Sequence, residues 1–255
     1  MFPDIASLFD APALTAFDVA LVGLIFVWTG FVRSGLGFGG AALGLPLLLL
    51  IHNQPIFWLP IIGAHLLFFS AATLRTRMNN VNWQYLKRSG LYIVPSAIVG
   101  VFGLLNLPNH WLVLFIYSIT LFYAFVWLLN FDIRSSNDWA DKALLVLGGY
   151  VAGTSLTGAP LMVAVFMRNV SLAQLRNTLF VLWFLLVTIK MSTFTALSVD
   201  LHLWTAVLLL PVAAVGHVLG LRSHDMILRN DQLFKRIIGA VLILICLLGF
   251  WRGVG

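Results

Sequence analysis

The segment GFVRSGLGFGGAALGLPLLLLI, residues 30–51, combines a dense run of glycines with an apolar stretch that carries a single charge. Glycine permits backbone that breaks a helix, and irregular backbone at membrane depth is tolerated only inside protein or beside water. The apolar stretch 16–51 reaches about 54 Å as a helix, slightly short of the about 60 Å that two membrane crossings need. It therefore predicts a hairpin that is either one deep re-entrant turn or two short spans. The residues expected to break the helix are Gly30, Gly35, Gly37, Gly39, Gly40, Gly44 and Pro46.

The composition of the whole chain indicates a membrane protein. Of its 255 residues, 61% are apolar and 9% are charged, whereas soluble domains contain about 25% charged residues. This excludes a soluble enzyme, a disordered scaffold and a disulfide-stapled secreted domain. The net charge of +6 comes from basic residues in a few loops, which indicates topology rather than a nucleic-acid partner. The single cysteine, Cys246, can form no internal disulfide and gives no metal-ligand spacing.

Hydropathy predicts a polytopic all-α bundle in the lipid bilayer, built from two hairpins and a set of simple crossings. The hairpins are expected at 16–51 and 143–167, and the simple crossings at 56–74, 89–106, 110–130, 177–197, 203–221 and 234–252. Basic residues concentrate in the loops 75–88 and 222–236, which the positive-inside rule places in the cytoplasm. Counting crossings from these loops places both termini outside the cytoplasm.

The segment 143–167 must contribute an even number of crossings if both basic loops are cytoplasmic. Its 25 uncharged residues reach only about 37 Å as a helix, which is too short for two full crossings. A re-entrant hairpin that enters and leaves on the cytoplasmic side fits best. The residues expected to form its turn are Gly148, Gly149, Gly153, Gly158 and Pro160.

Each hairpin begins one half of the chain, and the two halves match one another with opposite orientations in the membrane. The first repeat is 1–130 and the second is 131–255, and alignment of Pro46 with Pro160 offsets the halves by 114 residues (160 minus 46). At matched positions, the basic loop 75–88 lies opposite a loop without basic residues. Swapped charge of this kind is typical of inverted-topology repeats, from which many secondary transporters are built.

A helix is expected to resume after each turn, at about 40–51 and 159–167. Each resumed helix offers an N-terminus with unpaired N–H groups and a partial positive charge, and glycines let an anion approach this backbone closely. Two such ends facing one cavity favour a small anionic substrate, an oxyanion. The alternative is that the glycines only allow close helix packing, which the spacing of Gly35 and Gly39 would also serve.

Three motifs follow one another in the chain. They are SGLGFGG at 34–40 with AALGLPLL at 41–48, GTSLTGAP at 153–160, and RNTL at 176–179. They resemble the signature of the TauE/SafE family of membrane exporters, including its GTGGPP-like motif and its R-A-T-L stretch, and the resemblance covers about residues 17–252. It implies export of a small sulfur-containing anion, such as sulfite or an organosulfonate, across the bacterial inner (plasma) membrane by a multi-pass protein with periplasmic termini. Ala41, Ala42 and Ala159 depart from the family pattern, which bears on the size of the substrate.

The candidate substrate-binding residues lie at the two turns. Arg33 could add a forked, charged donor to the backbone cradle, or it could reach an interface or bond to carbonyls at the turn. The hydroxyls of the second turn could donate to an oxyanion or satisfy the carbonyls of a broken helix. The full candidate set is Arg33, Gly37, Phe38, Gly39, Gly40, Thr154, Ser155, Thr157, Gly158 and Ala159.

Three ionisable residues lie within the spans, where charge is costly. His65 and His217 are candidates for carrying a coupling proton, because histidine titrates near neutral pH. The alternative is a neutral histidine that is hydrogen-bonded between helices. Lys190 lies about 10 Å from the outer end of its span and is expected to be an interface anchor.

The sequence favours a secondary transporter that works by alternating access and is driven by the proton gradient or the membrane potential. A passive anion channel shares these features and remains an alternative. An intramembrane serine hydrolase with Ser155 and His217 is a weaker one, because the second glycine of a G-x-S-x-G elbow comes one residue late. No P-loop, HExxH, CxxC or dinucleotide fingerprint occurs, so no enzyme activity, catalytic residue, cofactor or metal is expected. A homodimer is left open.

Overall fold

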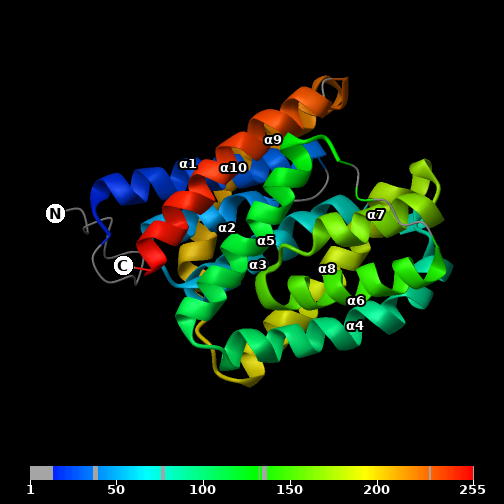
Figure 1. Ribbon diagram of the computed structural model, residues 1–255, viewed down its shortest axis with the longest axis horizontal. Helices are drawn as coiled ribbons and strands as arrows, with labels where there is room; N and C mark the ends of the chain where they lie inside the picture. The colour runs from blue at the N-terminus through cyan, green and yellow to red at the C-terminus, as the bar shows by residue number, and fades with distance from the viewer. Residues whose placement is uncertain are drawn as a thin grey trace.

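The computed structural model describes residues 14–36, 40–75, 78–131, 133, 137–229 and 231–254, which form a bundle of helices (Figure 1). The described part of the chain contains no strand, so the predicted all-α class is confirmed. The elements are α1 (Ala16–Leu36), α2 (Gly40–Ile51), α3 (Pro55–Leu74), the 3-10 helix η2 (Met78–Asn80), α4 (Trp83–Asn106), α5 (Asn109–Leu128), α6 (Asp138–Ser155), α7 (Ala159–Asn169), α8 (Leu172–Ala196), α9 (Leu203–Arg229) and α10 (Asp231–Val254).

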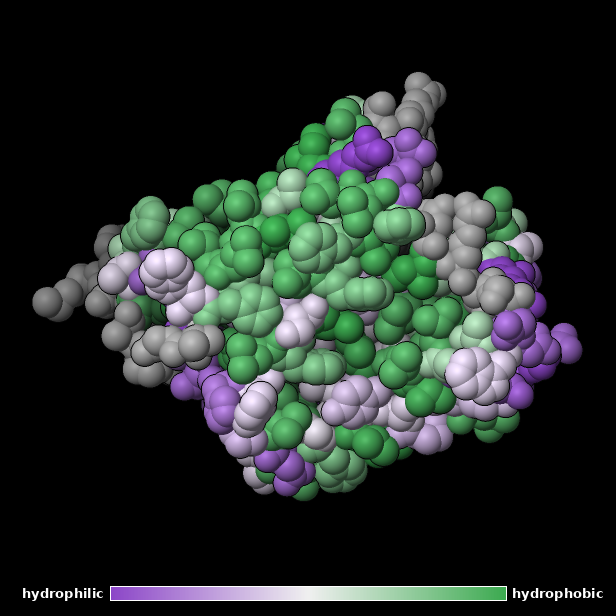
Figure 2. Space-filling model, in the orientation of Figure 1, coloured by the Kyte–Doolittle hydropathy of each residue, from purple (hydrophilic) through white to green (hydrophobic). Residues whose placement is uncertain are grey.

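Seven of the described helices are long and apolar enough to cross a membrane: α1, α3, α4, α5, α8, α9 and α10. The helices α2 and α7 have only 12 and 11 residues, and a 12-residue helix of about 18 Å cannot cross a hydrocarbon core of about 30 Å. Figure 2 shows a broad apolar surface between hydrophilic residues gathered at the two ends of the molecule. The prediction of a polytopic membrane protein is therefore confirmed.

Several helices extend further than the predicted apolar segments. α4 begins at Trp83 rather than at residue 89, because the Asn82 side chain accepts a hydrogen bond from Tyr85 N at 2.9 Å and caps the helix. α8 begins at Leu172 rather than at residue 177, and α9 continues to Arg229 rather than ending at 221. Hydropathy marks only the apolar centre of a helix, so polar turns at its ends are missed.

The two glycine-rich segments are each a longer helix followed by a short one. In 143–167, α6 ends at Ser155 and Leu156 adopts the left-handed conformation, with φ 60°. Pro160 then occupies the first turn of α7, where its missing N–H costs no helical hydrogen bond. In 16–51, α1 alone is long enough to cross a membrane, which differs from two short spans, and residues 37–39 between α1 and α2 lie outside the described residues.

Helices α1 and α9 run parallel with their backbones in direct contact. A methyl group on Gly30 would overlap Ala213 O, and one on Gly216 would overlap Val27 O. The contacting residue numbers rise together in both helices, from Gly216 beside Val27 O to Gly220 beside Phe31 O. The two helices are therefore parallel. Glycine lets two helices approach until their backbones touch.

Helices α4 and α6 form a second pair of the same kind. A methyl group on Gly100 would overlap Tyr150 O, and one on Gly153 would overlap Ala97 O. In Figure 1 this pair lies along the lower edge of the bundle and the α1–α9 pair along the upper edge. The helices α3 and α8 pack together between the two pairs, and α5 packs on α10.

Contacts between loops define two ends of the bundle. At one end Asn109 Nδ2 donates to Asn53 O at 2.8 Å, and the rings of Phe57 and His202 lie 4.5 Å apart. At the other end, which we call the basic end, Asn80 Nδ2 donates to Ala173 O at 2.7 Å. The basic end takes its name from its charged residues Arg75, Lys87, Arg88, Lys142, Arg168 and Arg176.

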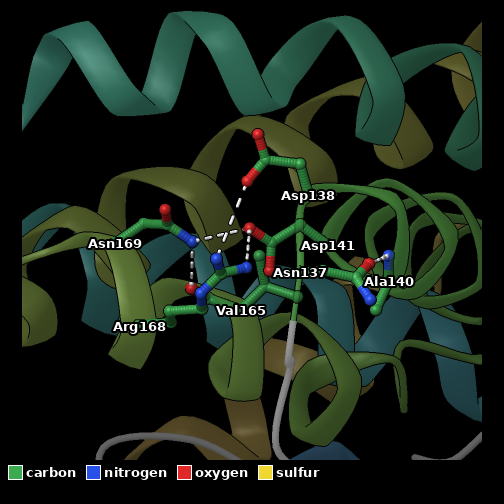
Figure 3. Close-up of polar contacts among 7 residues, drawn as sticks. All are labelled: Asn137, Asp138, Ala140, Asp141, Val165, Arg168 and Asn169. Carbon is green, nitrogen blue, oxygen red and sulfur yellow. Dashed lines mark hydrogen bonds and ion pairs between the residues drawn. The ribbon is translucent and has the colours of Figure 1, made fainter.

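A polar clamp at the basic end joins the start of α6 to the end of α7 (Figure 3). Asp141 Oδ2 accepts hydrogen bonds from Arg168 Nη1 and Asn169 Nδ2, each at 3.0 Å. The Asp141 side chain is 11% exposed, whereas that of Asp138, whose carboxylate lies 3.7 Å from Arg168 Nη2, is 79% exposed. The buried carboxylate therefore fastens the start of α6 to the end of α7, and the exposed one adds little.

Alanine at Gly216 is expected to lower the free energy of unfolding by about 3 kcal/mol or more, because the added methyl group forces two backbones apart. Thermal unfolding in detergent measures this effect. Gly90→Ala is the matched control, since nothing lies within 4 Å of a Cβ at Gly90; it is expected to stabilise α4 by about 0.5–1 kcal/mol. Equal melting temperatures for the two variants would contradict the contact.

Asp141→Asn is expected to destabilise the protein by about 2 kcal/mol, because it removes the charge on which Arg168 and Asn169 converge. The same thermal measurement on Asp138→Asn serves as the control and is expected to show less than about 0.5 kcal/mol. A larger loss for Asp138→Asn than for Asp141→Asn would show that the buried carboxylate is not the fastening residue.

Candidate functional site

A partly open cavity, about 520 Å³ with the open space at its mouth included, lies in the middle of the bundle. It is bounded by the beginnings of α2 and α7, the ends of α1 and α6, and the facing sides of α3 and α8. Both glycine-rich segments therefore contribute to its wall. The residues that line it are Arg33, Gly40, Ala41, Leu66, Ser70, Ala152, Leu156, Ala159, Phe180, Trp183, Leu186 and Val187.

Two side chains of this cavity, Arg33 and Trp183, carry buried hydrogen-bond donors that lack acceptors in the described part of the chain. Arg33 is 5% exposed, and its Nε and Nη2 have no hydrogen-bond partner among the described residues. The Nε1 of Trp183 is likewise buried without an acceptor in that part of the chain. The Arg33 guanidinium carbon lies 4.1 Å from the centre of the Phe69 ring, which holds the side chain in place.

The charge balance of the cavity is positive. No aspartate belongs to the lining residues, and the chain contains no glutamate. A buried guanidinium that lacks both a counter-ion and acceptors is strongly destabilising. A ligand that is negatively charged and carries several acceptor oxygens would satisfy Arg33 and Trp183 together.

The first turns of α2 and α7 form part of the same wall. Gly40 is the first residue of α2 and Ala159 is the first residue of α7, and both line the cavity. The N–H groups at the start of a helix have no intrahelical acceptor, and the helix dipole makes this end partly positive. The structure thus brings Arg33, Gly40 and Ala159, three of the predicted residues, to one cavity.

The predicted hydroxyl residues do not line the cavity. Thr154 Oγ1 donates to Tyr150 O at 2.9 Å and Gly100 O at 3.2 Å. Ser155 Oγ donates to Val151 O at 3.0 Å and lies 2.6 Å from Thr157 Oγ1. These hydroxyls satisfy carbonyl groups around the break between α6 and α7, the second of the two roles that the sequence allows.

The predicted glycines have different roles where they are described. Gly158 faces α6, because a methyl group on it would overlap Gly148 O and lie 2.7 Å from Ala152 N. Gly40 both lines the cavity and packs closely, since its methyl group would lie 2.8 Å from Thr29 O. Gly37, Phe38 and Gly39 lie outside the described residues.

The two predicted histidines lie in different surroundings. His65 is 2% exposed, and its Nε2 bonds to Ala206 O at 2.7 Å, which joins α3 to α9. His217 on α9 is half-buried, its Nδ1 is within hydrogen-bond distance of Ser34 Oγ, and its ring lies 4.8 Å from that of Phe69. His217 is therefore close to Arg33, whereas His65 ties two helices together.

Sequence reasoning missed two residues and misplaced one. Trp183 was not singled out, although it lies on the same face of α8 as Lys190, seven residues away. Arg176 was named only as the first residue of the RNTL motif, but its Nη2 donates to Ser34 O at 3.4 Å, beside the cavity arginine. Lys190 is not an interface anchor, because it is 1% exposed inside the bundle. The helical spacing of 176, 183 and 190 could have signalled one polar stripe.

Comparison with known proteins identifies the family of the chain. The family model described as "Sulfite exporter TauE/SafE" matches residues 22–248. Comparisons with curated proteins and with solved structures give no match. The match covers most of the chain, including every helix that lines the cavity.

Proposed function

Because the chain belongs to the TauE/SafE family of membrane transporters, we propose that it exports a small sulfur-containing anion, sulfite or an organosulfonate, across the bacterial inner membrane. The observation that carries this proposal is the cavity at the two helix breaks, where the donors of Arg33 and Trp183 have no acceptors among the described residues. A sulfite or sulfonate group carries three acceptor oxygens and negative charge, which match a forked guanidinium and two helix N-termini.

The lining of the cavity also suits this class of substrate. It is mainly apolar, with Leu66, Phe180 and Leu186 beside the polar groups. Such a wall would accommodate the carbon chain of an organosulfonate while Arg33 holds its charged end.

We attribute export to alternating access between two inverted repeats, 1–130 and 131–255. The parallel contact of α1 with α9 has a counterpart in the parallel contact of α6 with α4, as expected if α1 corresponds to α6 and α4 to α9. The basic end would face the cytoplasm and the termini the periplasm. Rocking of one glycine-joined pair against the other would open the cavity to each side in turn.

The membrane potential is sufficient to drive such export. Moving one negative charge outward is favoured by about 2.3 kcal/mol per 100 mV when the inside is negative. This corresponds to roughly fifty-fold accumulation, so proton coupling is not an energetic requirement.

His217 is the better placed of the two candidates for a coupling proton. Ser34 Oγ lies 3.0 Å from Gly30 O and also contacts His217 Nδ1. The hydroxyl proton can serve only one of these acceptors, so Ser34 donates to Gly30 O when Nδ1 carries a proton and can turn to His217 when it does not. Arg33 and Arg176 are the charged groups that interact with His217. Protonation would thus rearrange the α1–α9 contact beside the substrate.

The two alternative functions make different demands on the structure. A serine hydrolase would need Ser155 beside a histidine, but Ser155 Oγ bonds to Val151 O and Thr157 Oγ1, and His217 contacts Ser34. A passive channel would conduct anions without accumulating them. Accumulation of labelled sulfite against its gradient in proteoliposomes with an imposed potential separates transport from conduction.

Arg33→Met is expected to weaken sulfite binding by about tenfold to a hundredfold, because it removes a charged donor worth about 1.5–3 kcal/mol. Calorimetric titration of sulfite into the purified protein measures this, and export from proteoliposomes should fall in parallel. Arg75→Met, at an exposed arginine of the basic end, is the control and should bind as the unaltered protein does. Equal sulfite affinities for the two variants would show that the anion does not bind at Arg33 in this cavity.

His217→Gln is expected to flatten the dependence of sulfite export on pH, because it removes the titratable ring that contacts Ser34. Initial rates in proteoliposomes at a series of external and internal pH values provide the measurement. His110→Gln, at an exposed histidine of α5, should leave the pH profile as it is. A profile that His217→Gln does not alter would assign the coupling proton elsewhere.

A further inference from the structure

Lys190 is a buried cation that the cavity does not explain. It lies in α8, is 1% exposed, and its Nζ has no hydrogen-bond partner among the described residues. Its nearest aromatic contact is the Phe194 ring, whose centre is 5.9 Å from Nζ. An ammonium group is strongly hydrated and has three donors, so this position is costly unless something accepts from it.

No carboxylate of the described chain serves as its counter-ion. Asp141 is engaged by Arg168 and Asn169 at the basic end. Asp200, in the loop after α8, pairs with His202 at 3.5 Å and is 73% exposed. Neither carboxylate is bonded to Lys190, whose Nζ has no hydrogen-bond partner in the described part of the chain.

The position of Lys190 on α8 aligns it with the cavity. Residues seven apart in a helix lie about 20° apart around its axis and about 10 Å apart along it. Trp183, which lines the cavity, is seven residues before Lys190. Lys190 therefore continues the cavity face of α8 toward the end opposite the basic end.

Packing between α3 and α8 separates Lys190 from the cavity in this structure. Leu186 and Val187 close the wall one turn before the lysine. At the same level Gly63 of α3 is in close contact with Met191, since a methyl group on Gly63 would lie 2.8 Å from its sulfur atom. An anion that leaves Arg33 in this direction must pass this contact, and Lys190 is the next cation along α8.

We propose that Lys190 is a second binding site for the transported anion, occupied on the outer side of the α3–α8 contact after the anion has left Arg33. The proposal rests on the proposed export of a small sulfur-containing anion. The ligand chemistry is a sulfite or sulfonate group whose oxygens accept from the Lys190 ammonium. The unpaired charge of Lys190 then assists transport, because it lowers the free-energy barrier for an anion that crosses the apolar half of the path.

The test uses Lys190→Met, which keeps the length of the side chain and removes its charge. Sulfite binding is measured by calorimetry on the purified protein, and export of labelled sulfite is measured in proteoliposomes. Lys190→Met is expected to slow export at least tenfold and to change the affinity at the cavity less than threefold. Its melting temperature should equal or exceed that of the unaltered protein, because an unpaired buried charge has been replaced by an apolar group.

Two further variants make the result specific to charge at this position. Lys190→Arg is expected to retain export within about threefold, and Lys190→Gln should be as slow as Lys190→Met. Lys87→Met, at an exposed lysine of α4, is the matched control and should export normally.

Each outcome distinguishes this inference from the proposed function. Export by Lys190→Met at the rate of the unaltered protein would overturn the second site and leave the proposed function standing. A lower melting temperature for Lys190→Met, with export lost in proportion, would assign Lys190 a structural role and also overturn it. If the unaltered protein itself neither binds nor exports sulfite or an organosulfonate, the proposed function fails and the second site falls with it.

Discussion

The rest of the structure depends on the backbone contact that glycine allows between parallel helices. Where Gly30, Gly216 and Gly220 join α1 to α9, carbonyl groups of one helix occupy the space that side chains would fill. The contact of α4 with α6 has the same character. These two pairs fix the position of each helix break, and the breaks in turn bring the beginnings of α2 and α7 to one cavity. A short helix that cannot cross the bilayer is held in place by a long neighbour that can.

The interior of the bundle contains basic side chains without acidic side chains to balance them. Arg33 and Lys190 are each nearly inaccessible, and neither has a carboxylate partner in the described chain. Structural ion pairs normally compensate such burial. Here the aspartates whose side chains the structure describes lie toward the ends of the bundle, at Asp18, Asp138, Asp141 and Asp200. Under the proposed function, the compensating charge comes from the anionic substrate.

Hydropathy and helix-breaking residues predicted six of the seven membrane-spanning helices and the position of the break after α6, because both depend on local sequence. Helix α1 was predicted only as part of a hairpin over 16–51. Helix ends were placed up to eight residues wrong, as at the end of α9, and capping residues such as Asn82 extend a helix beyond its apolar centre. The site was predicted in part. Arg33, Gly40 and Ala159 were identified from the turns, but the direction in which Lys190 and Trp183 point depends on which face of α8 meets α3. That face is a property of tertiary packing, and a single sequence does not specify it.

The contact of Asp141 with Arg168, which joins the start of α6 to the end of α7, should be insensitive to salt. Asp141 meets Arg168 at 3.0 Å with only 11% of its side chain exposed, whereas dissolved ions screen charges over about 8 Å at physiological ionic strength. Dissolved ions therefore screen the buried Asp141–Arg168 pair very little. They can screen the pair of Asp138 with Arg168, because Asp138 is exposed. The start of α6 should thus stay attached to the end of α7 in concentrated salt as in dilute buffer, so that high ionic strength would weaken only the outer contact of Asp138.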